Sequence, residues 1–262
     1  MWNYFKSFPG GVVSRLVLYV GEIAVLFGQT VYLCFVPPFK GERILIQAKQ
    51  IGPGSFFIAA LVAFFIGMIM ALQMAYQMTK LSAEIYIPSV IAVSLTRELA
   101  PVLTALIVAG RVGAGITAEL GSMAVTEQVE ALKAFAVNPI KYLVVPRFLA
   151  LIVMLPVLSI FADLIGIMGG FVICVTKLYI SPALYFTMIA ESLAIKDVMT
   201  GLFKTVFFGA IIALVGCHQG LNVRSGAEGV GRATTTSVVA SFILIIMVDC
   251  LFTTLFYFVL HV

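Results

Sequence analysis

The chain has 262 residues, of which 62% are hydrophobic and only 11% are charged, whereas a soluble domain carries about a quarter charged residues. Sixteen basic and twelve acidic residues give a formal net charge of +4, too few charges to coat a soluble globule of this size. The composition indicates an integral membrane protein, and the basic residues are not gathered in the patch that a nucleic-acid binder needs. The four cysteines form no CxxC pair, so neither a disulfide framework nor a zinc site is indicated.

The first apolar segment, Val12 to Val36, carries a polar stripe, because Arg15, Glu22 and Gln29 recur every seven residues along one side of a helix. Such a helix suits a position in the plane of the lipid headgroups. The alternative is a sixth spanning helix whose stripe faces the protein interior. The chain thus divides into residues 1–50, an interfacial helix with a cytoplasmic linker, and residues 51–262, the membrane domain.

Five further segments reach the length of about 20 apolar residues needed to cross a hydrocarbon core of about 30 Å. They are predicted as transmembrane helices at Ser55–Met78, Ile87–Gly110, Tyr142–Val175, Gly201–Cys217 and Ser237–Val259. As one straight helix the third would be about 50 Å long, so it tilts or bends, with Pro146 and Pro156 available for the bend. Dividing it would leave two pieces too short to cross. The predicted fold class is therefore an all-α membrane protein with five spans.

The distribution of basic residues predicts the orientation of these spans. Eleven lysines and arginines fall before the first span and in the loops after the second and fourth spans. The opposite loops hold only Lys80, Lys177 and Lys196. Because cytoplasmic loops carry the excess of positive charge, the N-terminus is predicted inside and the C-terminus outside. Five spans give this odd parity, which favours leaving the N-terminal helix out of the count.

Four ionisable residues, Arg97, Glu98, Lys204 and Asp249, lie within predicted spans. Each costs about 2.5 to 3.5 kcal/mol at membrane depth and needs a partner or a water-filled cavity. Adjacent helical residues point about 100° apart, so Arg97 and Glu98 do not share one partner. Lys204 and Asp249 form a structural ion pair, or all four groups line a site for an amphiphile with a charged head. Arg97 is the best candidate for a phosphate contact, because guanidinium binds phosphate oxygens bidentately.

The sequence does not indicate an enzyme. A hydrolase needs a nucleophile with a general base, and neither His218 nor His261 lies near a serine in a recognisable arrangement. No phosphate loop of the form G-x-x-x-x-G-K-[ST] is present, so we expect no ATP or other cofactor in this chain. Asp163 is a further acidic residue, but its neighbours Gly166 and Gly170 have the spacing of close helix packing.

Residues 126–136, between the second and third spans, are predicted to form a short amphipathic helix on the cytoplasmic side. A short helix held by two membrane helices can transmit a push to them, although on the pattern alone it can equally lie passively on the membrane surface. Its apolar face consists of Val129, Leu132 and Phe135 or Ala136, and its polar side chains are Glu127, Glu130 and Lys133.

Several sequence blocks follow one another along nearly the whole chain. They are LTRELAP (95–101), ELGSMAVTEQVEAL (119–132), Asn138-Pro139, YLVVPR (142–147), a Gly-rich loop at 220–231 and Asp249. Together with the interfacial N-terminal helix, they closely resemble the MlaE family, the permease subunits of lipid-transporting ABC systems. The number of blocks and their order make this resemblance specific.

The resemblance implies a homodimeric permease in a bacterial inner membrane, with the N-terminus cytoplasmic and the C-terminus periplasmic. Its cargo would be phospholipid, moved between inner and outer membranes to maintain outer-membrane lipid asymmetry. The implied partners are an ABC ATPase subunit that carries ATP and Mg, a STAS-domain subunit and a periplasmic MCE-domain protein.

The resemblance also implies roles for the residues singled out above. Glu127, Glu130 and Lys133 would lie where the short helix meets the ATPase, and Arg97, Glu98, Lys204 and Asp249 in or near the lipid cavity. Two other functions stay open. A homologous permease importing another lipid, such as a sterol, would share every motif. An ion-coupled secondary transporter would use Lys204 and Asp249 as a proton relay, but five spans without inverted repeats count against it.

Overall fold

The computed structural model describes residues 12–37 and 41–258, so Val259 and His261 lie outside the described residues. Within those ranges the chain contains helices and no strand. Five helical segments are long and apolar enough to cross a membrane: Gly41–Leu81, Glu84–Val125, Ile140–Thr176, Ile195–Leu221 and Gly226–Phe258. The predicted fold class, five long apolar helices with a shorter helix at the N-terminus, is confirmed.

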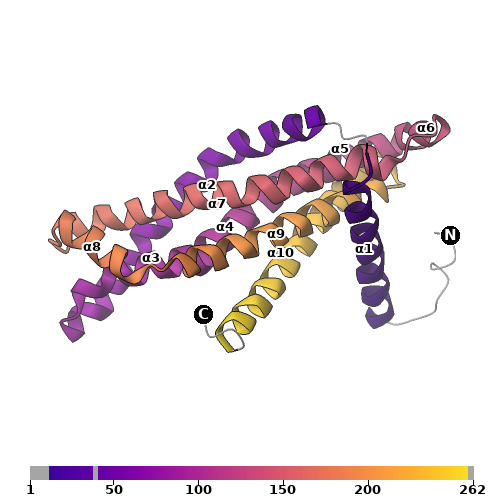
Figure 1. Cartoon of the computed structure of the whole chain (residues 1–262). Helices are drawn as coiled ribbons and strands as arrows, with labels where there is room; N and C mark the ends of the chain where they lie inside the picture. The colour runs from indigo at the N-terminus through magenta and orange to yellow at the C-terminus, as the bar shows by residue number, and fades with distance from the viewer. Residues whose placement is uncertain (1–11, 38–40, 259–262) are drawn as a thin grey trace.

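The described helices follow one another without long loops (Figure 1). In chain order they are α1 (Val12–Cys34), α2 (Gly41–Met78), η2 (Thr79–Leu81), η3 (Glu84–Tyr86), α3 (Ile87–Ser94), η4 (Leu95–Leu99), α4 (Ala100–Val108), η5 (Ala109–Gly113), α5 (Ala114–Val125), α6 (Gln128–Ala134), η6 (Ile140–Val144), α7 (Val145–Thr176), α8 (Pro182–Ser192), α9 (Ile195–Leu221) and α10 (Gly226–Phe258). The elements η4, η5 and η6 are π-helical turns inside or at the start of longer helices.

The long helices extend beyond the apolar runs from which the spans were predicted. The first begins at Gly41 rather than near Ser55, and the second continues to Val125 rather than ending at Gly110. At 1.5 Å per residue, a segment of 41 residues is about 60 Å long, roughly twice the hydrocarbon thickness. The helices therefore continue outside the apolar layer, where hydrophobicity gives no signal of them.

The prediction of a Gly-rich loop at 220–231 is wrong. α9 runs to Leu221 and α10 begins at Gly226, which leaves only a short connection between them. Gly220 packs against α5, where an added Cβ would meet Leu120 and the Thr117 carbonyl oxygen. Gly220 allows this close helix contact, and the packing outweighs the cost of about 1 kcal/mol for a glycine inside a helix.

Glycine also brings α2 and α7 together, the two helices that cross in Figure 1. A Cβ at Gly67 would overlap the carbonyl of Gly166, and one at Gly169 would overlap the carbonyl of Phe64. No larger side chain fits at either point without moving a helix. The packing role predicted for the Gly166 and Gly170 spacing is confirmed on the Gly166 side by this contact, while Gly170 lies against Ile91 and Tyr185.

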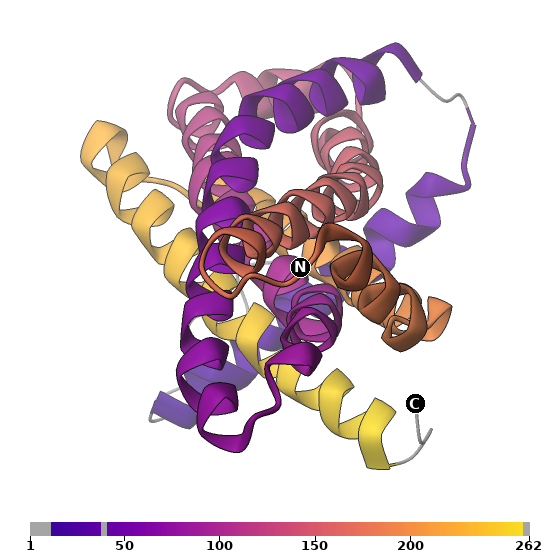
Figure 2. The same cartoon turned by 90° about the vertical axis from the view of Figure 1, so that its left-hand side faces the viewer.

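α1 runs across the direction of α7 and α9, at the end of the bundle where α5 and α6 lie, as Figures 1 and 2 show. Its described side chains include exposed Val25, Phe27 and Tyr32, and its apolar segment is shorter than the five long helices. This direction agrees with a position in the plane of the membrane surface rather than with a sixth parallel span. The side chain of Arg15, part of the predicted stripe, lies outside the described side chains.

Candidate functional site

The second long helix is interrupted by a π-helical turn at the two charged residues that the sequence singled out. Arg97 and Glu98 both lie in η4, where the amide of Ala100 donates to the carbonyl of Leu95, five residues back. Pro101 follows, and because it has no N–H it cannot bond to the carbonyl of Arg97. That carbonyl instead lies 3.5 Å from the Lys204 ammonium. Turns of this kind are frequent at functional sites.

Lys204 of α9 is the centre of a buried polar cluster. Its Nζ lies 2.5 Å from Glu98 Oε2, 2.9 Å from Asp249 Oδ1 and 2.7 Å from Thr253 Oγ1. The Thr253 hydroxyl also lies 3.1 Å from Glu98 Oε1. The Lys204 side chain is 1% exposed, whereas those of Glu98 and Asp249 are 36% and 20% exposed. A buried ammonium is thus satisfied by carboxylates that partly reach open space.

Arg97 points to a different partner, as expected for a residue adjacent to Glu98. Its Nη1 lies 3.4 Å from Oδ1 of Asp197, in the first turn of α9. Asp197 is buried, and its other oxygen accepts a hydrogen bond from the backbone amide of Ala194 at 3.0 Å. Asp197 therefore stabilises the start of α9 and holds the Arg97 guanidinium at the same time.

Gly201 explains why these groups meet. An added Cβ there would overlap the carbonyl oxygen of Thr96, so α9 approaches η4 more closely than any other residue would permit. Lys204 follows three residues later, on the same side of α9. The close approach at Gly201 thereby brings the ammonium within reach of Glu98.

A cavity of about 140 Å³ opens beside the cluster. Its polar lining comes from Arg97, Glu98, Lys204 and two threonines, and its aromatic lining from Phe256 and Tyr257 near the end of α10. The cavity lies toward the start of α9 and the end of α10, away from α6. Charged and aromatic side chains thus line one cavity between helices that are apolar over most of their length.

The short helix after the second span differs in detail from its prediction. α6 covers Gln128–Ala134 instead of 126–136, because Glu127 adopts a left-handed backbone conformation with φ of 61° and separates α6 from α5. Of the predicted apolar face, Val129 is buried, but Phe135 is 80% exposed. The apolar face is therefore narrower than the pattern suggested, and α6 projects from the end of the molecule (Figure 1).

The predicted polar side of α6 is open to the surroundings. Glu127 and Glu130 are both exposed, and Glu130 Oε1 pairs with Lys133 Nζ at 2.7 Å on the helix surface. The helices on either side of α6 in the chain are joined by the buried Arg147. Its Nη2 lies 2.8 Å from Glu119 Oε1, and its Nη1 donates to the Leu143 carbonyl oxygen at 2.7 Å. These contacts join α5 to the start of α7, the two helices between which α6 lies in the chain.

The structure brings together three of the four membrane charges that the sequence analysis named, Glu98, Lys204 and Asp249. Arg97, the fourth, lies beside them. Lys204 and Asp249 do form an ion pair, and Arg97 and Glu98 do have different partners. In residues 12–37 and 41–258, no group of histidine, cysteine and acidic side chains is arranged to hold a metal ion.

The sequence analysis missed two side chains that contact the four charges, Thr253 and Asp197. Thr253 lies four residues after Asp249, on the same helix face, and this spacing was a signal available in the sequence. Asp197 lies outside the predicted fourth span, at a helix start that hydropathy does not mark.

Residues 44–255 match the family model described as Permease MlaE. A probable ABC transporter permease protein of Rickettsia prowazekii is 46% identical over 257 residues, which cover 94% of this chain and 99% of that protein. Probable ABC transporter permease proteins of Synechocystis and Pyropia yezoensis are 44% and 38% identical, over 78% and 79% of this chain and the same shares of their own lengths. The chain therefore belongs to the MlaE family of ABC transporter permeases.

Proposed function

We propose that this chain is the permease subunit of an ABC transporter that moves phospholipids between the inner and outer membranes and so maintains outer-membrane lipid asymmetry. The observation that supports a lipid cargo is the cavity beside Lys204, which combines a guanidinium, an ammonium and the Glu98 carboxylate with aromatic walls. A phospholipid has the matching chemistry, because its head is charged and its tails are apolar. Arg97 is the group proposed to contact the phosphate, since guanidinium matches phosphate oxygens.

The proposal includes a homodimer. At about 140 Å³ the cavity of one chain is smaller than the 300 to 1,000 Å³ typical of sites for small ligands, and a two-tailed lipid needs more space. α10, which lines this cavity, exposes large apolar side chains along its length, among them Ile243, Ile246 and Leu251. A second copy related by two-fold symmetry would enlarge the cavity and cover apolar surface.

The energy source is proposed to be a separate ABC ATPase subunit that carries ATP and Mg. The exposed Glu127 and Glu130, with Lys133, would contact this subunit. α6 follows directly on the helical segment that contains η4, so a push on α6 acts along that segment toward Arg97 and Glu98. Closure of the ATPases would thus change the shape of the cavity. The proposed complex also contains a STAS-domain subunit and a periplasmic MCE-domain protein, in a bacterial inner membrane with the chain's N-terminus cytoplasmic.

The proposal is tested by purifying the tagged chain in mild detergent from its native membrane and identifying co-purifying proteins and lipids by mass spectrometry. We expect an ATPase, an MCE-domain protein and glycerophospholipid. Recovery of a sterol as the main lipid would favour a permease for another lipid. Recovery of the chain without an ATPase, together with proton-driven transport in vesicles, would favour a secondary transporter.

The contact role of Arg97 is tested in the same preparation. Arg97→Ala is expected to lower the amount of phospholipid per complex and the transport rate, because the cavity loses its guanidinium. Lys177→Ala, which removes an exposed cation beyond α7, is the matched control and should leave both unchanged. Normal lipid occupancy and transport in a correctly assembled Arg97→Ala complex would refute the headgroup contact.

A further inference from the structure

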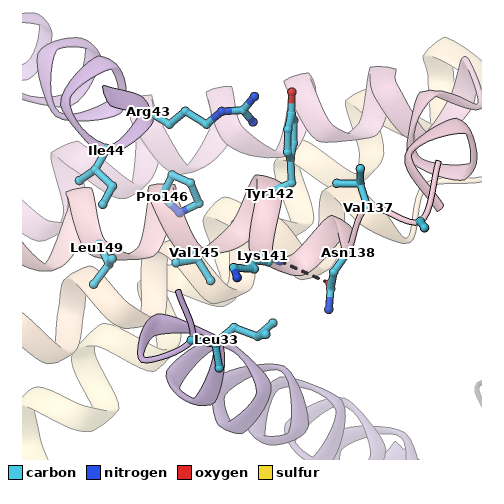
Figure 3. A pocket seen from close by; sticks show the side chains of 12 residues that line it. Leu33, Arg43, Ile44, Val137, Asn138, Lys141, Tyr142, Val145, Pro146 and Leu149 are labelled. Atoms are coloured by element: carbon cyan, nitrogen blue, oxygen red, sulfur yellow. Dashed lines mark hydrogen bonds between the residues drawn. The ribbon is translucent and has the colours of Figure 1, made fainter. Parts of the chain in front are cut away.

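A second and larger pocket, of about 350 Å³, lies at the other end of the molecule from the Lys204 cluster. It is enclosed by the end of α1, the start of α2, the segment after α6 and the start of α7, as Figure 3 shows. Its walls are mainly apolar and include Leu33, Ile44, Val145, Pro146 and Leu149. A pocket of this size falls within the range that binds small ligands.

Two cations line this apolar pocket, Arg43 and Lys141. The Arg43 guanidinium carbon lies 3.4 Å from the centre of the Tyr142 ring, which fixes the side chain at the pocket edge (Figure 3). Lys141 Nζ donates to the Pro37 carbonyl oxygen at 3.0 Å. Among the described residues neither cation has a carboxylate within ion-pair distance. Glu42, next to Arg43, is exposed and does not line the pocket.

The surroundings of the pocket identify the class of anion. α1 lies across the long helices here and exposes Tyr32, and the exposed Phe35 follows its last residue, so apolar surface continues outward from the pocket near Leu33. Two half-buried cations above an apolar floor, at the end of membrane-spanning helices, suit a phosphate attached to acyl chains better than a free anion.

We infer that this pocket binds an anionic phospholipid of the surrounding membrane, with its phosphate between Arg43 and Lys141 and a chain along Leu33, Ile44 and Leu149. This lipid is a structural ligand and is separate from any lipid in the cavity at Arg97. It would join α1, α2 and α7 next to the segment that follows α6. The inference depends on the membrane-spanning fold and not on the proposed cargo.

The inference is tested on the purified full-length chain in mild detergent by hydrogen–deuterium exchange. Dioleoyl phosphatidylglycerol is expected to slow amide exchange in residues 136–142. Dioleoyl phosphatidylcholine and inorganic phosphate should have little effect at the same concentration. Arg43→Gln with Lys141→Gln is expected to weaken the apparent affinity for phosphatidylglycerol about thirtyfold, because each of the two cations contributes about 1 kcal/mol near an anionic lipid.

Two further variants make the outcome decisive. Lys49→Gln with Arg224→Gln removes the same charge from exposed positions outside the pocket and should leave the protection unchanged. Leu149→Trp fills the pocket without changing its charge and should abolish the protection, which tests the site even if the double charge variant does not fold. Equal protection by phosphatidylcholine, equal protection by inorganic phosphate, or protection that persists in Leu149→Trp would overturn the inference.

Discussion

Replacing Lys204 with methionine tests how the charged cluster is held together. Methionine keeps most of the side-chain volume but removes the ammonium that contacts Glu98, Asp249 and Thr253. Removing one partner of a buried ion pair costs about 3 to 5 kcal/mol, because the opposite charge stays behind without compensation. Here the two carboxylates are 36% and 20% exposed and regain some water. We therefore expect a loss near the lower limit, about 3 kcal/mol in the free energy of unfolding.

The assay is a reversible unfolding titration with sodium dodecyl sulfate in mixed micelles. Lys49→Met, on the exposed surface of α2, is the control and should change the free energy of unfolding by no more than about 0.5 kcal/mol. Glu98→Gln combined with Lys204→Met should be less destabilising than the sum of the two single changes by at least about 1 kcal/mol. If Lys204→Met, like the control, changes the free energy of unfolding by no more than about 0.5 kcal/mol, the cluster does not stabilise the fold and our reasoning is wrong.

Three further predictions concern other parts of the molecule. Gly201→Ala should destabilise the chain by about 1 to 3 kcal/mol in the same titration, because the new methyl group overlaps the Thr96 carbonyl of η4. Tyr185→Phe should cost about 1 kcal/mol by removing the 2.8 Å hydrogen bond to the Ile167 carbonyl. Burial raises the pKa of Tyr185, so the phenol stays protonated in the folded chain. The destabilisation by Tyr185→Phe should therefore be constant from pH 6 to 9. The contribution of the hydrogen bond should decline only above the pKa of about 10 that the phenol has in the unfolded chain. Glu127→Lys with Glu130→Lys should abolish lipid-stimulated ATP hydrolysis by the assembled complex.

Each of these variants has a matched control. Gly231→Ala adds a methyl group where no atom lies within 4 Å and should be neutral or slightly stabilising. Tyr179→Phe changes an exposed tyrosine and should have no measurable effect. Glu42→Lys with Glu228→Lys reverses two exposed charges outside α6, and lipid-stimulated ATP hydrolysis should survive. An effect of the control as large as that of its test variant would refute the corresponding prediction.

Most of the fold could be predicted because membrane insertion makes hydrophobicity a direct structural signal. The apolar runs located all five long helices, including Ile140–Thr176, whose length argued for one helix. The helix ends could not be predicted in the same way, because α2 before Ser55 and the segment after Gly110 leave the apolar region while their backbone stays helical. The Gly-rich segment was misassigned because glycine is read locally as a turn signal, whereas Gly220 serves helix contact.

The site could be predicted only in part. Charge in an apolar run identified Arg97, Glu98, Lys204 and Asp249, since such residues are costly unless they are paired. The pairing itself depends on the π turn at η4 and on the close approach of α9 at Gly201, which join residues about a hundred positions apart. Neither the turn nor the approach leaves a periodic pattern in the sequence. Contacts of this range are set by how whole helices pack.

α9 has neither a proline nor a π turn along its length, whereas α7 contains Pro156 and the segment Glu84–Val125 contains the π turns η4 and η5. At one end His218 Nε2 lies 3.0 Å from Glu22 Oε2 of α1, and at the other end Lys204 enters the charged cluster. These two residues are fourteen positions apart, so about 21 Å of uninterrupted helix separates them. Helices bend sharply at prolines and π turns, which α9 lacks. The helix is therefore a stiff rod, and a tilt imposed on it at the membrane surface changes the position of the ammonium deep in the bundle.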